Sequence, residues 1–135
     1  MTLDQEAFIT QVERAISVDP LPLTTKAIFI GIFSQAVNDM VFPKVYLSGS
    51  PEFDPDDESW ACLQEGSWDP RLKYLNLPTI SSISDEEWER VLYEVTQLVM
   101  ASRMDLTRLL GNAEGRPVAV GWDGGDVHIL FVAKK

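Results

Sequence analysis

The 135-residue sequence contains one cysteine, Cys62, and one histidine, His128. A single cysteine excludes an intramolecular disulfide, which fits a reducing compartment. One cysteine and one histidine also cannot supply the ligand set of a structural zinc site. We therefore expect a fold held by its hydrophobic core, without a metal or other cofactor, and a chain of this length can bury enough apolar surface for that.

Long hydrophobic runs are absent as well. The longest, from Ala27 to Phe33, is far shorter than the roughly 20 residues that a membrane-spanning helix needs. The first ten residues lack a basic segment followed by an apolar one, so they do not resemble a secretory signal. These features predict a soluble, cytoplasmic protein that does not associate with membranes.

Basic side chains are scarce: 11 Lys and Arg stand against 21 Asp and Glu, and the net charge is -10. A negative field of this size repels phosphate backbones and anionic lipids, which argues against nucleic-acid binding. The same field accelerates encounters with a basic protein. The alternative interpretation is that the acidity only keeps the protein in solution.

Apolar periodicity indicates a helix over residues 3–18, where Phe8, Val12 and Ile16 recur at helical spacing. Either Asp4 alone or Thr2 together with Gln5 can cap its first turn. The two prolines at 20 and 22 end the helix, because proline lacks the backbone donor that a helix requires. One amphipathic helix is therefore expected at the start of the chain.

Residues 26–33 are β-branched or aromatic at both alternating sets of positions, which is typical of a strand covered on both faces. A buried helix running to Met40 is the alternative, since periodicity alone does not exclude it. With the strand interpretation, Asn38-Asp39 forms a turn into a second strand over 41–47. Pro43 then lies at a sheet edge or a bulge.

A second helix is predicted from Asp85 to about Ser102, capped by Ser84 with Glu87 three residues later. Its apolar stripe is expected in the core and comprises Trp88, Val91, Leu92, Val95, Leu98 and Val99. Residues 104–110 either continue this helix or form a short one ending at Gly111-Asn112. Two β-rich runs, 118–122 and 127–133, then form a hairpin through the glycine-containing turn at 123–126.

This order of elements predicts a single α+β domain: an antiparallel or mixed sheet of about four strands, with two main helices packed on one face. The segment from 48 to 76 has no periodicity, although Arg71 to Leu77 could form a short strand. Loops this long are uncommon in compact domains. Because Phe53, Trp60 and Trp68 can pin it to the body of the protein, we expect an ordered surface flap.

The flap is also the most acidic part of the chain, with no Lys or Arg between Lys44 and Arg71. It is interpreted as a solvated loop, as a docking surface for a basic protein, or as a divalent-cation site. The cation site is disfavoured because the spacing lacks the glycine and the terminal glutamate of a calcium-binding loop. The residues predicted to contact a partner are Glu52, Asp54, Asp56, Asp57, Glu58, Trp60, Trp68 and Asp69.

No catalytic residue is assigned, because no phosphate-binding loop, dinucleotide fingerprint or nucleophile elbow occurs. Cys62 and His128 are the only possible thiol–imidazole pair, and both are better explained as buried or sheet-face residues. Two alternatives to a binding protein stay open. One is a carboxylate- or metal-dependent hydrolase using Asp54, Asp57 or Asp69, and the other is a structural or oligomeric module with Phe42 or Trp122 in an interface.

One stretch of the flap resembles a known class of proteins. Ser48-Gly49-Ser50, followed by Phe53-Asp54, Asp57 and Trp60-Ala61-Cys62 in a small acidic chain, is similar in style to bacterial immunity proteins of polymorphic-toxin and contact-dependent inhibition systems. Such proteins are small, cytosolic and often acidic, and they neutralise a toxin by binding it. The resemblance therefore implies a non-enzymatic protein that binds a basic toxin domain, and it assigns no individual residue.

Overall fold

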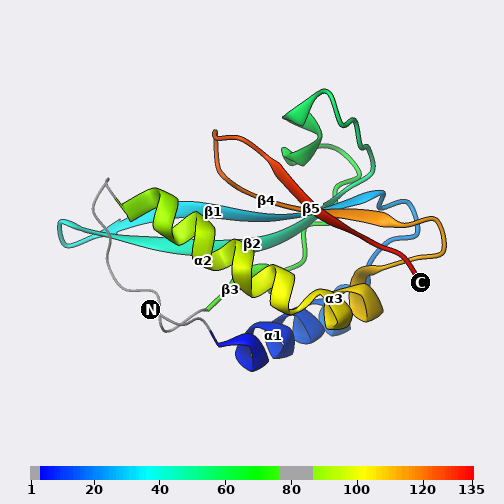
Figure 1. Cartoon of the computed structure of the whole chain (residues 1–135), viewed down its shortest axis with the longest axis horizontal. Helices are drawn as coiled ribbons and strands as arrows, with labels where there is room; N and C mark the ends of the chain where they lie inside the picture. Colours follow the sequence, from blue (N-terminus) through cyan, green and yellow to red (C-terminus); the bar gives the residue numbers. More distant parts are fainter. Residues whose placement is uncertain (1–3, 77–86) are drawn as a thin grey trace.

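The computed structural model describes residues 4–76 and 87–135. Within this part of the chain, three α-helices cover one face of a five-stranded sheet (Figure 1). The helices are α1 (Gln5–Val18), α2 (Trp88–Ala101) and α3 (Arg103–Leu110). The strands are β1 (Ala27–Val37), β2 (Met40–Ser50), β3 (Tyr74–Leu75), β4 (Arg116–Trp122) and β5 (His128–Ala133). The predicted α+β class is confirmed. The prediction of two main helices and about four strands is close, and the structure adds one short helix and one short strand.

The sheet is mixed, in the order β3-β2-β1-β4-β5. β1 pairs antiparallel with β2 and parallel with β4, and β4 pairs antiparallel with β5. A parallel pair needs a long crossover, and the chain between β2 and β4 supplies it with α2 and α3 on one face. The central position of β1 explains why both of its faces are apolar.

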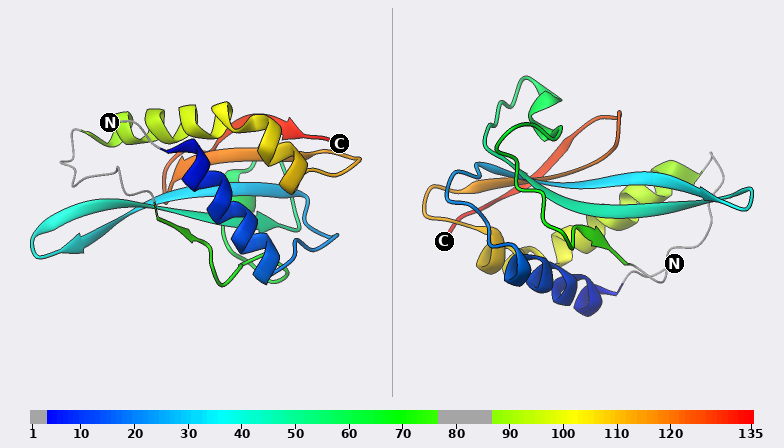
Figure 2. Two further views of the ribbon diagram at one scale, coloured as in Figure 1. Left: turned by 90° about the horizontal axis from the view of Figure 1, so that it is seen from below. Right: turned by 180° about the vertical axis from the view of Figure 1, so that it is seen from behind.

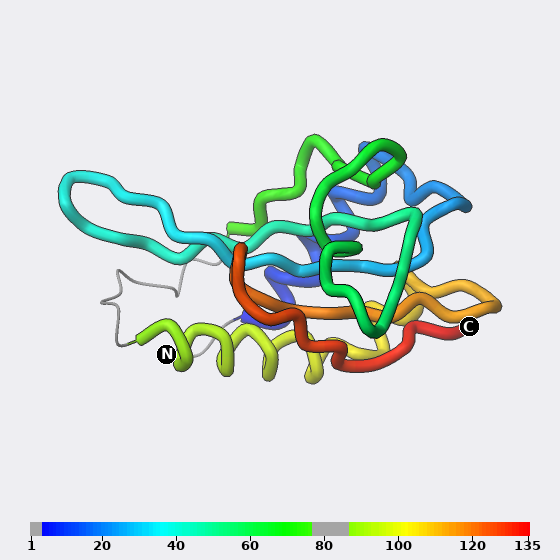
Figure 3. The backbone as a smooth tube through the Cα atoms, turned by 90° about the horizontal axis from the view of Figure 1, so that it is seen from above, coloured from blue at the N-terminus to red at the C-terminus, as the bar shows by residue number. Residues whose placement is uncertain are grey.

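The β1–β2 hairpin confirms the strand interpretation of residues 26–33 and extends it. Asn38 and Asp39 both have positive φ (51° and 65°), as a two-residue turn requires, and the strands pair from Val37 with Met40 to Ala27 with Ser50. The tip of this hairpin projects beyond the rest of the sheet (Figure 3). Pro43 lies in β2 beyond its pairing with β3, so its missing donor interrupts no strand pairing on that side.

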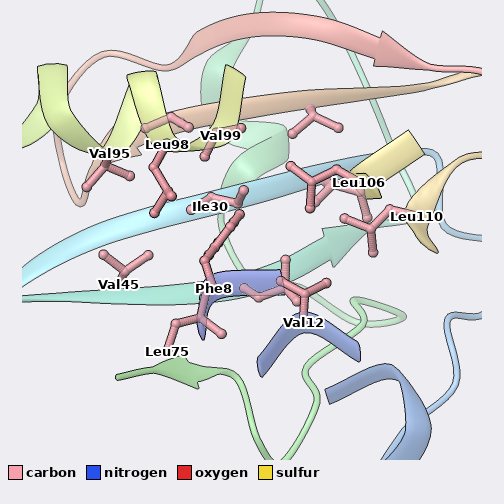
Figure 4. Close-up of a cluster of buried hydrophobic side chains, with 14 of the residues drawn as sticks. Phe8, Val12, Ile30, Val45, Leu75, Val95, Leu98, Val99, Leu106 and Leu110 are labelled. Atoms are coloured by element: carbon pink, nitrogen blue, oxygen red, sulfur yellow. The ribbon is translucent and has the colours of Figure 1, made fainter. Parts of the chain in front are cut away.

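The first helix follows the predicted pattern. The Asp4 carboxylate accepts a hydrogen bond from the Ala7 amide at 3.2 Å and caps α1, whereas Thr2 lies outside the described residues. Phe8, Val12 and Ala15 are fully buried against the sheet. They meet β1 and β2 side chains such as Ile30 and Val45 in one continuous core (Figure 4).

The helix predicted to end at about Ser102 is α2, and residues 104–110 lie in a separate short helix, α3, which is one of the two predicted alternatives. α2 ends at Ala101, and the buried Ser102 hydroxyl bonds to the Leu98 carbonyl at 2.8 Å before α3 begins. The apolar stripe is confirmed at its buried positions, but Trp88 is a correction: as the first residue of α2 it is 42% exposed and stacks on Trp122. The predicted cap Ser84 lies outside the described residues.

All three helices lie on the same side of the sheet, and the first part of the segment between β2 and β3, with Phe53 and Trp60, lies on the other side (Figure 2). We call these two sides the helix face and the flap face. Each face carries its own cluster of buried apolar side chains, and β4 contributes to both. Val118 and Val120 point to the helix face and Ala119 points to the flap face. No helix in the described ranges is long and apolar enough to cross a membrane.

Candidate functional site

The predicted flap is an ordered structure closed at its base. Gly49 and Trp68 exchange two backbone hydrogen bonds, at 3.0 and 2.8 Å, which makes a closed loop of the residues between them. This closed loop, residues 51–67, is the central part of the flap predicted over 48–76, and from here the name flap refers to residues 51–67 only. Within it, residues 58–61 form one turn of 3-10 helix. Seen from its own side, the flap lies over β1, β2 and β4 (Figure 3).

The two tryptophans hold this segment in place, and they do so on opposite faces of the sheet. Trp60 packs on the flap face with its ring 5.2 Å from that of Phe53 and 6.4 Å from that of Phe29. Trp68 joins the helix-face core, and its indole donates a hydrogen bond to the Asp19 carbonyl at 2.9 Å. Each is only 4% exposed.

This burial corrects the role predicted for the tryptophans. Both rings are enclosed by the protein itself, so in this structure they fix the flap and do not face a partner. The physical reason is that a loop of this length loses much conformational entropy on ordering, and burial of large aromatic rings offsets that loss. The sequence argument that aromatics pin the flap to the body of the protein is confirmed.

The carboxylates behave differently from the rings. The predicted partner-binding acids of the flap are all exposed: Glu52, Asp54, Asp56, Asp57 and Glu58. Asp54 accepts a hydrogen bond from the Asp56 amide at 2.9 Å, and Asp57 accepts one from the Ser59 amide at 3.0 Å. These bonds set the local turns and leave the negative charges at the surface.

Two of the predicted acids, Glu58 and Asp69, bond to other parts of the molecule. The Glu58 carboxylate accepts a hydrogen bond from the Val127 amide and so connects the flap to the β4–β5 hairpin. Asp69 lies just beyond the flap and pairs with Lys73 at 2.7 Å. Asp69 is therefore partly neutralised, unlike the acids of the flap.

Hydrogen bonding stabilises the charged form of one flap acid, Asp57. The bonds that Asp57 accepts from Ser59 lower the pKa of its carboxyl group, because they stabilise the charged form. A hollow of about 330 Å³ lies beside it, lined by Lys26, Glu52, Phe53, Asp54, Asp57, Ser59 and Trp60. Three of these seven side chains are acidic and one is basic, so the hollow has a net negative lining.

A larger pocket, of about 470 Å³, lies between the flap and the β4–β5 turn. Its floor includes Phe29 and Tyr46, and one wall is the turn at Asp123. The Tyr46 hydroxyl donates a hydrogen bond to Asp123 at 2.5 Å. Burial, and then this bond to Asp123, raise the pKa of the Tyr46 phenol, so it stays protonated. Sequence reasoning named none of these residues as part of a site.

Glycines in the sheet make room for this arrangement. Gly31 of β1 and Gly121 of β4 are directly paired neighbours. A Cβ on Gly31 would lie 2.1 Å from the Tyr46 ring, and one on Gly121 would lie 2.4 Å from the Asp126 carbonyl. The pair therefore lets the ring and the turn approach the sheet closely. A glycine between two isoleucines in an otherwise β-branched strand was the signal available in the sequence.

Cys62 and His128 do not form a site together in the described structure. Cys62 is exposed and lines the larger pocket, whereas His128 is exposed at the start of β5 and does not line it. The expectation that Cys62 is buried is therefore wrong, whereas His128 lies on an exposed face of the sheet, which is one of the two positions expected for it. A β-bulge between Val118 and Ala119 shifts the register of β4 with β5.

No group of three or more His, Cys, Asp or Glu side chains within residues 4–76 and 87–135 is arranged to hold a metal ion. Comparison of the chain with protein-family models, with curated proteins and with solved structures finds no match. Function is therefore argued from the geometry alone.

Proposed function

We propose that this protein is a non-enzymatic binding protein whose acidic flap docks on a basic protein, as an immunity protein docks on a toxin domain. The observation that carries the proposal is that the aromatic and the acidic side chains of the flap have different surroundings. The Trp60 ring is buried and holds the flap in place, while all six carboxylates of the flap, Glu65 included, are exposed. A preorganised surface costs less entropy on binding than a flexible one.

Charge complementarity favours a basic partner. The flap contains no Lys or Arg, and the whole chain has a net charge of -10. The acid-lined hollow beside Asp57 is suited to an ammonium or guanidinium group from a partner. Such surfaces steer association and fix orientation more than they add affinity. The single cysteine of the sequence fits a reducing compartment, so we place this role in the cytoplasm.

The product of the neighbouring open reading frame is the first partner to test. We expect its complex with this protein to weaken several-fold between 50 and 300 mM salt, because added salt shortens the Debye screening length, which is about 8 Å at physiological ionic strength. We expect the triple variant Asp54→Asn/Asp56→Asn/Asp57→Asn to bind more weakly. Asparagine keeps the oxygen acceptors that shape the loop and removes only the charge.

A matched control separates a local effect from a loss of net charge. The variant Glu6→Gln/Glu89→Gln/Glu114→Gln removes the same number of charges at exposed positions outside the flap. Docking through the flap predicts near wild-type affinity for this control. Equal weakening of both triple variants, or of neither, contradicts the proposal.

A further inference from the structure

The pocket between the flap and the β4–β5 turn combines an apolar floor with an acidic rim. Phe29 and Tyr46 form the floor, Leu63 of the flap and Val127 after the turn form apolar walls, and Asp123 lies at the edge. At about 470 Å³ it falls within the size range of sites that bind a compact ligand or an anchor side chain.

The charges that line this pocket are all acidic. Glu58 and Asp123 contribute carboxylates, and no Lys or Arg is among the described residues that line it. Lys73 lines a smaller hollow that shares Tyr46, Leu63 and Asp123 with this pocket, and its ammonium lies 2.7 Å from Asp69. The bonds to Tyr46 and to the Val127 amide involve one oxygen of each carboxylate. A carboxylate has two oxygens, so each can accept a further donor.

We propose that this pocket receives an arginine side chain of the protein on which the flap docks. The inference rests on the proposed function and specifies its anchor point. A guanidinium is planar, permanently charged and weakly hydrated, and it stacks on aromatic rings, so it matches a floor of Phe29 and Tyr46. Its aliphatic stem matches Leu63 and Val127. Arginine is also among the residues most enriched at the centres of interfaces.

The turn keeps the mouth of the pocket open. Gly124 and Gly125 line it without side chains, and a Cβ added at Gly124 would meet no atom within 4 Å. The opposite wall contains Cys62, the only cysteine of the chain, whose side chain is exposed. The pocket can therefore be blocked chemically in the folded protein, without any substitution.

The test is an NMR titration of the full chain with a glycine pentapeptide that carries arginine at its centre and has blocked ends. The same peptide with citrulline, which keeps the shape and lacks the charge, is the comparison. We expect shifts of the Gly124, Gly125 and Leu63 amides with the arginine peptide. We expect binding at least fivefold weaker with citrulline.

Two perturbations locate the binding. Asp123→Asn keeps an acceptor for the Tyr46 hydroxyl and removes the charge, and we expect it to weaken binding about tenfold. Its control is Asp126→Asn, an exposed residue of the same turn that does not line the pocket, with an expected change below twofold. A bulky aromatic maleimide on Cys62 is expected to abolish binding, whereas a methylthio group on the same sulfur is expected to preserve it.

The outcomes distinguish this inference from the proposed function. The natural partner is tested against the same variants. If its binding is unchanged by Asp123→Asn and by the blocked Cys62 but is lost in Asp54→Asn/Asp56→Asn/Asp57→Asn, the arginine pocket is overturned and docking through the flap stands. The opposite pattern supports the pocket and overturns docking through the flap carboxylates. Equal binding of the arginine and citrulline peptides overturns the pocket, and the salt dependence of the complex with the natural partner then decides the proposed function separately.

Discussion

The two faces of the sheet are built from alternate residues of the same strands, and they differ in side-chain size. On the helix face β1 places Ile28, Ile30 and Ile32, all fully buried under the three helices. On the flap face the same strand places Ala27, Phe29 and Gly31, under a loop held by Trp60. Large branched side chains close the helix face, while on the flap face Ala27 and Gly31 leave space on either side of Phe29.

This difference separates stability from recognition. The helix face is a continuous cluster of buried apolar side chains, and in such a close-packed interior each methylene contributes to the free energy of folding. The flap face has a small aromatic cluster, hollows and exposed carboxylates. Surfaces that bind are commonly built on a rigid scaffold in this way. The predictions below test whether the two faces are as separable as their packing indicates.

The largest effect is expected from Ile30→Ala on the helix face. Ile30 is fully buried in the central strand, so we expect the free energy of unfolding to fall by about 4 kcal/mol. Urea denaturation followed by circular dichroism measures this loss. Ile129→Ala in β5, where the side chain is 45% exposed, is the control and should cost far less. Similar losses for both variants would mean that the helix face is not the principal core.

Arg116→Met is expected to cost about 3 kcal/mol, because it leaves several buried carbonyls without a donor. Arg116 is 5% exposed, and its guanidinium donates to the carbonyls of Thr25 at 2.8 Å and Leu110 at 2.9 Å. It also reaches the carbonyls of Gly111 and Pro22 and so joins the end of α3 to the chain before β1. Arg108→Met, at an exposed position, should change the free energy of unfolding by about 0.5 kcal/mol or less in the same denaturation experiment.

Trp60→Ala is expected to open the flap without unfolding the helix face. Loss of its ring contacts should lower the free energy of local opening by about 2 kcal/mol, which corresponds to roughly 30-fold faster amide exchange over residues 51–67. Exchange in α2 and α3 should stay nearly unchanged. The control is Leu63→Ala in the same loop, where the side chain is 54% exposed. Equal acceleration in the flap and the helices would show that the two faces unfold as one unit.

Tyr46→Phe should have the smallest effect at neutral pH, roughly 1 kcal/mol for one hydrogen bond. Its diagnostic effect is on the pH dependence. The folded-state pKa of Tyr46 is raised by burial and by Asp123 above the ordinary value of about 10, so its contribution is fully present below pH 10 and declines as the pH rises further. Stability should therefore fall less steeply above pH 10 in Tyr46→Phe than in the wild type. Tyr93→Phe, on the exposed surface of α2, should leave the slope unchanged.

Local features of the fold could be predicted from the sequence because they depend on neighbouring residues. The helical spacing of Phe8 and Val12 and the cap at Asp4 lie within a few turns of chain. The Asn38-Asp39 turn likewise encodes its own positive φ values. Residues 26–33 are apolar on both faces, which predicted a strand with other parts of the chain packed on each side. The acidity of the flap was evident from composition.

Tertiary structure decided what depends on distant segments. The pairing of β1 with β2 places the Tyr46 ring over Gly31, and the parallel pairing of β1 with β4 brings the β4–β5 turn to the same place, so that Tyr46 reaches Asp123, 77 residues away. The fold also sends Trp60 and Trp68 to opposite faces, which turned two expected partner anchors into internal supports. The sequence by itself determined which segments are helical, extended or acidic, since those properties are local. The pocket and the separation of the two faces arose from contacts between segments that no local pattern specifies.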